Sequence, residues 1–291
     1  KDNDFIEHIF VASSHDDVLC FTDTGRVFRV KVYQIPEANR TSQGRAIINL
    51  LKLKDGENIV TFRAVQNFDD NDACLVFATS MGRVKRTAIS EYQNVNRGGI
   101  HAIRLNEGDS LIDVIQTNGH THILLATAKG KSIRFDENDA RLMGRTAAGV
   151  RGIALAEGDN VIGAVLAEDS ADLLTMTENG YGKRTPMIEY LVHSEDGSTR
   201  AQSRGGKGRK DIQTDSRNGL VADIRSVRDN DSLMFITANG MLVRIAASDI
   251  RTIGRNTKGV RVVNLKDDDR LIAAAKVEGI EETHQTASTP S

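Results

Sequence analysis

Arginine and lysine recur at fixed positions after five glycines, and this spacing is suited to binding a long anion. The segments Gly25-Arg-Val-Phe-Arg29, Gly82-Arg-Val-Lys-Arg86 and Gly240-Met-Leu-Val-Arg244 show the pattern, and Gly130 and Gly180 begin two further copies. Successive glycines of this kind lie between 48 and 60 positions apart. If the copies fold alike, their charges repeat in space at regular intervals, as the charges of a polyanion do.

A second glycine follows in each copy, and more basic residues surround it. Acidic residues concentrate in the turns that come next, so a chain with a net charge of −2 can still carry a positive stripe. Nothing in these segments is suited to reading base edges, and we expect contacts with phosphates that are independent of base sequence. The candidate phosphate-binding side chains are Arg26, Arg29, Lys31, Arg40, Arg45, Arg83, Lys85, Arg86, Arg97, Lys131, Arg134, Arg145, Arg151, Lys183, Arg184, Arg204, Lys207, Arg209, Lys210, Arg244, Arg255, Lys258 and Arg261.

The fourth copy carries an insertion with a glycine-rich core, Gln202-Ser203-Arg204-Gly205-Gly206-Lys207-Gly208. Glycine has no Cβ to hold a backbone away from a phosphate, so successive amides can form an anion-binding concavity. A flexible basic linker explains the same composition, and composition alone leaves both interpretations open. We expect the loop to be mobile without a ligand and to contribute little to folding.

Catalytic chemistry finds little support among the tyrosines. Tyr33, Tyr92 and Tyr190 recur about 8 to 10 positions after their glycines, which indicates an architectural role. Tyr181 lies in the turn at Gly180, with no acidic cluster beside it to hold a metal ion. We therefore predict no catalytic residue in this chain.

Metal and nucleotide sites also lack a pattern. His120 and His122 would share one face of a strand, but no further ligands stand at zinc-site spacing, so surface histidines are the better interpretation. The acidic turns such as Glu107-Gly-Asp109 supply two carboxylates each, which favours solvated turns over calcium sites. The motifs of serine hydrolases, zinc proteases and P-loop enzymes are absent from the sequence.

The elements that would position these charges are strands. Apolar, β-branched runs of four to eight residues alternate with Asn-Gly, Lys-Gly and Glu-Gly-Asp turns, and helical periodicity is scarce. We predict an all-β, propeller-like body of four-stranded blades, with five complete copies and a partial blade at the N-terminus. The copies fall near residues 8–65, 66–117, 118–167, 168–227 and 228–279, and residues 1–7 resemble the end of an earlier copy.

Composition is compatible with one intracellular domain. The 291 residues are 39% hydrophobic and 27% charged, and no apolar run approaches the length of a membrane span. We expect a monomeric domain over residues 1–279, a polar, disordered tail over residues 280–291, and a cytoplasmic location without a membrane partner. Cys20 and Cys74 have no CxxC partner and should be buried free thiols.

Several phrases of the sequence resemble the C-terminal domain of the DNA gyrase A subunit. These are Val30-Lys-Val-Tyr-Gln-Ile-Pro36, Gly144-Arg-Thr-Ala-Ala-Gly-Val-Arg-Gly152, Asn179-Gly-Tyr-Gly-Lys-Arg-Thr185 and Gly254-Arg-Asn-Thr-Lys-Gly-Val260. The resemblance covers residues 1–279 and implies a six-bladed β-pinwheel that wraps duplex DNA around its rim. The family's hallmark box, Gln-Arg-Arg-Gly-Gly-(Lys or Arg)-Gly, belongs to the first blade, so we expect this chain to begin just after it. The loop with Ser203 in the second box position would then be a secondary version.

The resemblance also implies partners and a place in an enzyme. The domain itself would be non-catalytic and without a cofactor, while ATP and Mg would bind other domains of a type II topoisomerase. Its partners would be double-stranded DNA, the rest of the A subunit, and the B subunit in an A2B2 enzyme that introduces negative supercoils. The equivalent domain of topoisomerase IV and a propeller scaffold for an acidic protein remain the alternatives. Because the cations at the first glycines have matching offsets, we expect them to form one continuous rim, with the acidic turns elsewhere.

Overall fold

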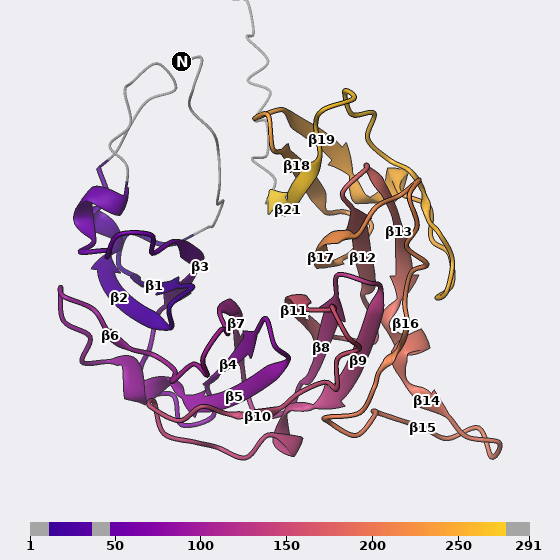
Figure 1. Ribbon diagram of the computed structural model, residues 1–291. Coiled ribbons are helices and arrows are strands. Elements are labelled where there is room, and N and C mark those ends of the chain that lie inside the picture. The colour runs from indigo at the N-terminus through magenta and orange to yellow at the C-terminus, as the bar shows by residue number, and fades with distance from the viewer. Residues whose placement is uncertain (1–11, 37–46, 278–291) are drawn as a thin grey trace, which may run out of the picture.

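The chain folds into five small antiparallel sheets placed side by side around a central space (Figure 1). The computed structural model describes residues 12–36 and 47–277. We number the sheets as blades 1 to 5 in chain order. The partial blade expected at residues 1–7 and the tail expected at residues 280–291 lie outside the described residues.

The predicted all-β, propeller-like fold is confirmed. Blade 1 contains β1 (Asp17–Thr22), β2 (Arg26–Lys31), β3 (Ile59–Val65) and β6 (Ile100–His101); blade 2 contains β4 (Cys74–Thr79), β5 (Arg83–Ala88), β7 (Leu111–Thr117) and β10 (Val150–Arg151); blade 3 contains β8 (His122–Thr127), β9 (Lys131–Asp136), β11 (Val161–Ala167) and β16 (Arg209–Lys210); blade 4 contains β12 (Asp172–Thr177), β13 (Tyr181–Pro186), β17 (Val221–Val227) and β20 (Val260–Arg261). Blade 5 has three strands among the described residues, β18 (Ser232–Thr237), β19 (Leu242–Ala246) and β21 (Leu271–Val277). A sixth sheet, which belongs to no blade, is the two-stranded hairpin of β14 (Val192–His193) and β15 (Thr199–Arg200). The described helices are short 3-10 turns, η1 (Val32–Gln34), η2 (Ile47–Leu50), η3 (Ile89–Tyr92), η4 (Glu137–Asp139), η5 (Met187–Tyr190) and η6 (Ala247–Asp249), and none of them is long and apolar enough to cross a membrane.

The outermost strand of each four-stranded blade comes from the following copy of the repeat. β6 of the second copy pairs with β2 of the first, and the same exchange joins β10 to β5, β16 to β9 and β20 to β13. Copies in the sequence and blades in the structure therefore do not coincide. Every exchanged strand ties two neighbouring blades together through the backbone.

The first glycine of each copy makes this exchange possible. The carbonyls of Gly25, Gly82, Gly130 and Gly180 each accept N–H groups from two successive residues just after the exchanged strand; these pairs are Ala102 and Ile103, Gly152 and Ile153, Asp211 and Ile212, and Val262 and Val263. The four glycines have φ between 81° and 87°, which L residues with a side chain rarely adopt. A Cβ on Gly130 would lie 2.1 Å from the carbonyl oxygen of Ile212. Glycine is thus required both for the hairpin turn and for the close approach of the next copy.

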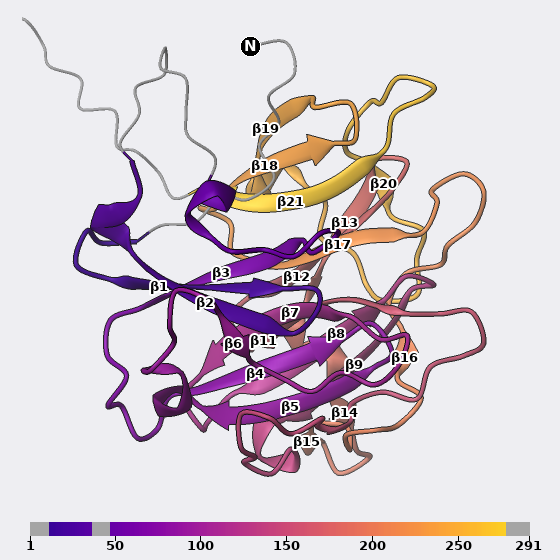
Figure 2. The ribbon, with the colours of Figure 1, turned by 60° about the vertical axis from the view of Figure 1, so that its left-hand side comes forward.

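The hydrophobic core lies between adjacent blades, so blades 2 to 4 are buried on both faces, and a further cluster covers the second face of blade 1. In blade 5, strand β19 has no buried side chain. At the first joint, Phe21 of β1 meets Phe77 of β4 edge to face, with 5.6 Å between the ring centroids. Similar clusters join blades 2 to 3, 3 to 4 and 4 to 5. The turned view of Figure 2 brings blade 1 forward, with blade 2 below it and blade 5 above it. Cys20 and Cys74 are buried and free, as predicted.

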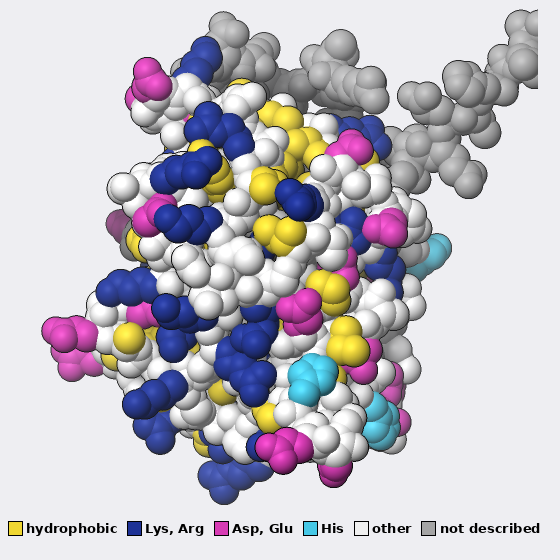
Figure 3. All heavy atoms as spheres, turned by 90° about the vertical axis from the view of Figure 1, so that its right-hand side faces the viewer, with side chains coloured by type: hydrophobic (Ala, Val, Ile, Leu, Met, Phe, Trp, Pro, Cys, Tyr) yellow, Lys and Arg dark blue, Asp and Glu magenta, His cyan; other side chains and the backbone are white. Residues whose placement is uncertain are grey.

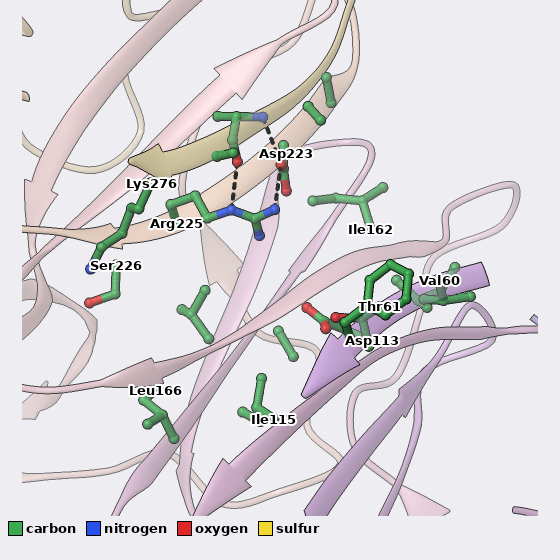
Figure 4. Close-up of a pocket in the computed structure, with 18 of the residues that line it drawn as sticks. Val60, Thr61, Asp113, Ile115, Ile162, Leu166, Asp223, Arg225, Ser226 and Lys276 are labelled. Carbon is green, nitrogen blue, oxygen red and sulfur yellow. Dashed lines mark hydrogen bonds and ion pairs between the residues drawn. The ribbon is translucent and has the colours of Figure 1, made fainter. Parts of the chain in front are cut away.

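The inner strands β3, β7, β11, β17 and β21 surround a cavity of about 720 Å³ (Figure 4). Each charged residue that lines the cavity has a partner of opposite charge. The Arg225 guanidinium lies 3.1 Å from the Asp223 carboxylate and donates to the carbonyl of Ala274 in the next blade, and Arg63 lies 3.2 Å from Asp113. Because these charges cancel locally, the centre of the molecule is not suited to a polyanion.

We predict that Gly130→Ala destabilises the whole body. The substitution imposes a left-handed conformation on alanine and places its Cβ against the Ile212 carbonyl, so the joint between blades 3 and 4 must open. We expect a loss of roughly 3 kcal/mol or more in the free energy of unfolding, measured by urea denaturation. Gly197→Ala is the matched control, since Gly197 also has positive φ but no atom within 4 Å of the added Cβ, and should cost only about 1 kcal/mol. Equal losses in the two variants would contradict the proposed packing role.

Candidate nucleic-acid interface

The exchanged strands form the outer edge of the blades and present one exposed side chain each. These side chains are His101 on β6, Arg151 on β10, Lys210 on β16 and Arg261 on β20. Each is the second residue of its strand, so the repeat places them at equivalent points of successive blades. Three of the four are permanently basic, so this edge carries positive charge on blades 2, 3 and 4.

Like charges stand opposite one another on this edge. Arg83 of β5 pairs in register with Arg151, and Lys131 of β9 pairs with Lys210. In the described residues, no carboxylate lies within ion-pair distance of these four groups. Like charges directly opposite each other destabilise an antiparallel pair. Such a pattern is therefore suited to an anion supplied from outside the chain.

Four exposed cations on this outer edge have uncommitted head groups. In the part of the chain that the structure describes, neither a hydrogen bond nor an ion pair engages the charged groups of Arg97, Arg151, Lys207 and Lys210. Arg97 precedes β6 of blade 1, Arg151 lies in β10 of blade 2, and Lys207 and Lys210 belong to the outer segment of blade 3. The side of the molecule that is on the right in Figure 1 shows patches of Lys and Arg with acidic side chains scattered among them (Figure 3).

Five of the predicted phosphate-binding side chains are buried, so the expectation that they line the rim is wrong. Blades 1 to 4 are packed on both faces, and the positions three and four residues after the first glycine, which hold Lys85, Arg134, Lys183 and Arg184, face a neighbouring blade. Arg26 follows its glycine directly and is paired with the buried Glu57. The set divides as follows: exposed are Arg97, Arg151, Lys207, Lys210, Arg244, Lys258 and Arg261; partly exposed are Arg29, Lys31, Arg83, Arg86, Lys131, Arg145, Arg204, Arg209 and Arg255; buried are Arg26, Lys85, Arg134, Lys183 and Arg184; Arg40 and Arg45 lie outside the described residues.

The arginine four residues after the glycine links its blade to the next one. The guanidinium groups of Arg29, Arg86, Arg134 and Arg184 donate, in that order, to the carbonyls of Gln93, Ala140, Met187 and Ala247, which lie in or directly after the 3-10 helix of the following blade. Arg244 of blade 5 is exposed and donates to Ser232 of its own sheet. The arginine at this position therefore recurs for a structural reason, because its hydrogen bonds join one blade to the next.

Two buried lysines have different surroundings. Lys183 lies 3.1 Å from the Asp211 carboxylate and also donates to Thr185 and to the carbonyl of Gly254. Lys85 donates to the Tyr92 hydroxyl and to two backbone carbonyls, and no carboxylate of the described residues lies within ion-pair distance of it. Burial lowers the pKa of Lys85 to about 7. Neither ammonium group can reach a ligand in solution, since both side chains are fully buried.

The predicted architectural tyrosines also include both buried and exposed side chains. Tyr92 and Tyr190 are fully buried, and their hydroxyls bond to the Ala102 carbonyl and to Asp211, so the predicted architectural role is confirmed for these two. Tyr33 is 70% exposed in η1, and the prediction is wrong for it. The position of Tyr33 in the repeat did not predict that its side chain is exposed in blade 1.

The glycine-rich loop is held in place by the protein, against the expectation of a mobile segment. The amide of Gln202 donates to the Arg134 carbonyl, the amide of Gly205 donates to the Gly152 carbonyl, and the amide of Ala154 donates to the Gly206 carbonyl. The Arg204 guanidinium donates to the carbonyls of Asp139 and Arg151. These bonds fix the loop across the outer edges of blades 2 and 3 and leave Ser203 and Lys207 exposed.

The acidic turns are more structured than the sequence suggests. Glu57 is buried, lies 2.8 Å from Arg26 and accepts hydrogen bonds from Thr22 and Thr24. Asp109 accepts hydrogen bonds from the backbone amide of Met81, in the neighbouring hairpin turn, and from the amide of Ser110, which follows it in the chain. Among the described residues, no group of three or more His, Cys, Asp or Glu side chains could hold a metal ion. Sequence reasoning missed exposed arginines such as Arg217, because they lie outside the repeated phrases.

We predict a pH-dependent joint between blades 3 and 4. His122 Nδ1 accepts a hydrogen bond of 3.0 Å from Arg134 Nε, and burial together with the Arg134 charge lowers the pKa of His122 despite the opposing influence of Asp136 and Asp169. Because the folded pKa lies below the usual 6.5, the neutral form stabilises the fold, and the free energy of unfolding should fall as pH decreases through and below about 6.5.

The control for this prediction is His122→Asp, because Asp17 and Asp172 occupy the same place beside Arg29 and Arg184 in blades 1 and 4. Urea denaturation at pH 7.5 and 5.5 should show a smaller loss of stability for the variant than for the parent chain. An identical loss in both would show that His122 is not the titrating group.

Comparison with known proteins agrees with this architecture. A family model described as the DNA gyrase C-terminal domain, beta-propeller, matches residues 16–66, 75–118, 121–168, 171–192, 200–228 and 231–278. The DNA gyrase A subunit of Escherichia coli (strain K12) is 41% identical over 277 residues, which are 95% of this chain and 30% of that protein. The same protein of Staphylococcus aureus (strain MRSA252) is 41% identical over 294 residues, which are 100% of this chain and 32% of that protein. The chain thus spans about a third of the length of these relatives.

Solved structures extend the comparison. A DNA gyrase A C-terminal domain superposes with a TM-score of 0.77 at 26% identity, covering 91% of this chain and 83% of that one. The C-terminal domain of a DNA topoisomerase IV superposes with a TM-score of 0.79 at 25% identity, covering 91% of this chain and 80% of that one. The family model and the relatives together show that this chain belongs to the family of C-terminal domains of the DNA gyrase A subunit.

Proposed function

We propose that this domain binds double-stranded DNA along the outer edges of its blades and bends the duplex around them. The observation that carries the proposal is the set of uncommitted, exposed cations on successive blades, Arg97, Arg151, Lys207 and Lys210. Duplex DNA offers phosphates at short, regular intervals, which matches a surface built from repeated units. The contacts involve charges alone, so binding should not depend on base sequence.

Bending requires many contacts of this kind. Deforming some tens of base pairs costs on the order of several kcal/mol, and no single surface ion pair provides that much. A row of blades distributes the contacts along the curve. The fixed glycine-rich loop adds Lys207 between the outer strands of blades 2 and 3, where a bent duplex would pass.

Within the longer protein, we propose that this domain is the DNA-wrapping part of DNA gyrase. Wrapping would present a positive crossover to the rest of an ATP-dependent type II topoisomerase and allow it to introduce negative supercoils. The partners would be the remainder of the A subunit, together with the B subunit of an A2B2 enzyme in the cytoplasm, at the nucleoid. This domain would contribute no catalytic residue and hold no cofactor, with ATP and Mg bound elsewhere in the enzyme.

The similarity to the C-terminal domain of a topoisomerase IV is compatible with the same class of function for this chain, because that domain also belongs to a DNA topoisomerase. A scaffold that binds an acidic protein is the alternative of a different class. Duplex DNA would then compete poorly with the protein partner. The binding of DNA would also not require the outer-edge cations of successive blades.

We predict that Arg151→Ala/Lys210→Ala weakens duplex binding about tenfold at low salt and reduces the slope of log Kd against log salt by about two, because two phosphate contacts are lost. Fluorescence anisotropy with a labelled duplex of about 40 base pairs measures both quantities. The matched control is Lys266→Ala/Arg270→Ala, which also removes two exposed cations but from the turn before the inner strand β21. If the control lowered affinity and slope as much as the outer-edge variant, the proposed DNA path would be wrong.

For the glycine-rich loop, we predict that stability and DNA binding depend on different residues. Arg204→Ala removes hydrogen bonds to the carbonyls of Asp139 and Arg151 and should cost about 1 to 2 kcal/mol in the free energy of unfolding. Lys207→Ala removes only an exposed charge and should change stability by less than about 0.5 kcal/mol while weakening DNA binding. Thermal denaturation and anisotropy on both variants test this division, and a destabilised Lys207→Ala variant would contradict it.

A further inference from the structure

Blade 4 departs from the other blades at its outer edge. The residue directly after the first glycine is basic in blades 1 to 3, at Arg26, Arg83 and Lys131, but it is Tyr181 in blade 4. Tyr181 pairs in register with Arg261 of the exchanged strand β20. Its hydroxyl oxygen accepts hydrogen bonds from Arg261 Nη2 at 2.8 Å and from Arg217 Nε at 3.1 Å. A phenol thus takes the position that a cation holds in the other blades, and its hydroxyl binds two guanidinium groups.

The aromatic ring of Tyr181 holds both arginines in position. The guanidinium carbons of Arg217 and Arg261 each lie 5.2 Å from the ring centroid, within the range of cation–π attraction. Tyr181 itself is only 3% exposed, whereas both arginines are exposed. The buried phenol therefore acts as a rigid support for two solvent-facing charges.

Neither guanidinium is neutralised by the protein. In residues 12–36 and 47–277, no carboxylate lies within ion-pair distance of Arg217 or Arg261. The acid nearest in sequence to Arg217 is Asp215, which accepts hydrogen bonds from Lys258 and from the backbone amides of Arg217 and Asn218. The Arg261 and Arg217 hydrogen bonds also lower the pKa of the Tyr181 hydroxyl.

We propose that Arg217 and Arg261, positioned by Tyr181, form a preorganised binding site for one phosphodiester group of duplex DNA. Two like charges that converge on one oxygen repel each other, and a phosphate placed between them would remove that repulsion. Guanidinium groups match phosphate oxygens in geometry, and each arginine keeps N–H groups that Tyr181 does not use. Tyr181 is a positioning residue, because it acts through the two arginines.

This site rests on the proposed DNA-binding function and extends it to blade 4. Its two cations come from different parts of the chain, Arg217 from the segment before β17 and Arg261 from the fifth copy. The duplex would therefore be held at blade 4 by a fixed pair of charges, whereas the exposed side chains of Lys207 and Lys210 in blade 3 have no such support. A contact of this kind sets where the backbone of the DNA lies on the rim.

The experiment compares Arg217→Ala/Arg261→Ala, Tyr181→Phe and the control Lys266→Ala/Arg270→Ala in duplex binding across a salt series. The double arginine variant should lose about tenfold in affinity at low salt and about two units of salt slope. Tyr181→Phe keeps the ring and both charges but removes the shared acceptor, so its affinity should fall several-fold with an unchanged slope. A simple loss of folding would lower both quantities and the melting temperature, which distinguishes it from this pattern.

The ligand itself is tested by recording the arginine Nε–H signals of the ¹⁵N-labelled chain while adding either the duplex or inorganic phosphate. Shifts of Arg217 and Arg261 with the duplex at micromolar concentration support the proposal. A response to inorganic phosphate together with none to the duplex would identify a free-anion site and overturn it. If the unaltered chain binds DNA but the double arginine variant and Tyr181→Phe both match the control, the site is wrong while the proposed function stands. If the unaltered chain binds no DNA, the proposed function itself fails.

Discussion

The hydrogen bonds from two successive amides to one glycine carbonyl are the interaction on which this structure depends. They occur at Gly25, Gly82, Gly130 and Gly180, and each fixes the point where one copy of the repeat crosses onto the previous blade. The exchanged strand, the packing between blades and the position of every outer-edge side chain follow from that crossing. No other residue type fits there, since the backbone needs positive φ and the next copy passes within contact distance.

The basic residues of the repeat consequently serve two separate purposes. Those on the strands next to the outer edge, such as Arg134 and Lys183, turn toward the neighbouring blade and are bonded there. Those on the exchanged strands, such as Arg151 and Lys210, are exposed, and among the described residues no hydrogen bond or ion pair engages their charged groups. The first group holds the blades together, and the second group is available to a ligand. A charge that recurs in every copy is thus a sign of structure as often as of binding.

Much of the fold could be predicted from the sequence, because turn glycines, strand-like runs and the repeat are local features. The division between buried and exposed cations could not. In β5, Arg83, Lys85 and Arg86 show no simple alternation of polar and apolar residues, because this sheet is covered on both faces. The exchange of strands was hidden for a similar reason, since Gly149 and Val150 look the same whether they pair with their own copy or the previous one. Arg217 could not be found at all, because it lies in a turn and its proposed role depends on a contact with Tyr181 in strand β13.

The exchange of strands also determines how the domain carries mechanical load. An outward pull on the outer edge of blade 2 acts on β10, which is paired with β5 but continues covalently into the third copy. The force is therefore shared between two blades, and peeling one blade from the row would require breaking a joint on its neighbour as well. A taut polymer lying along this edge would strain the row as a whole, so its tension would be spread over several cores before any one of them opened.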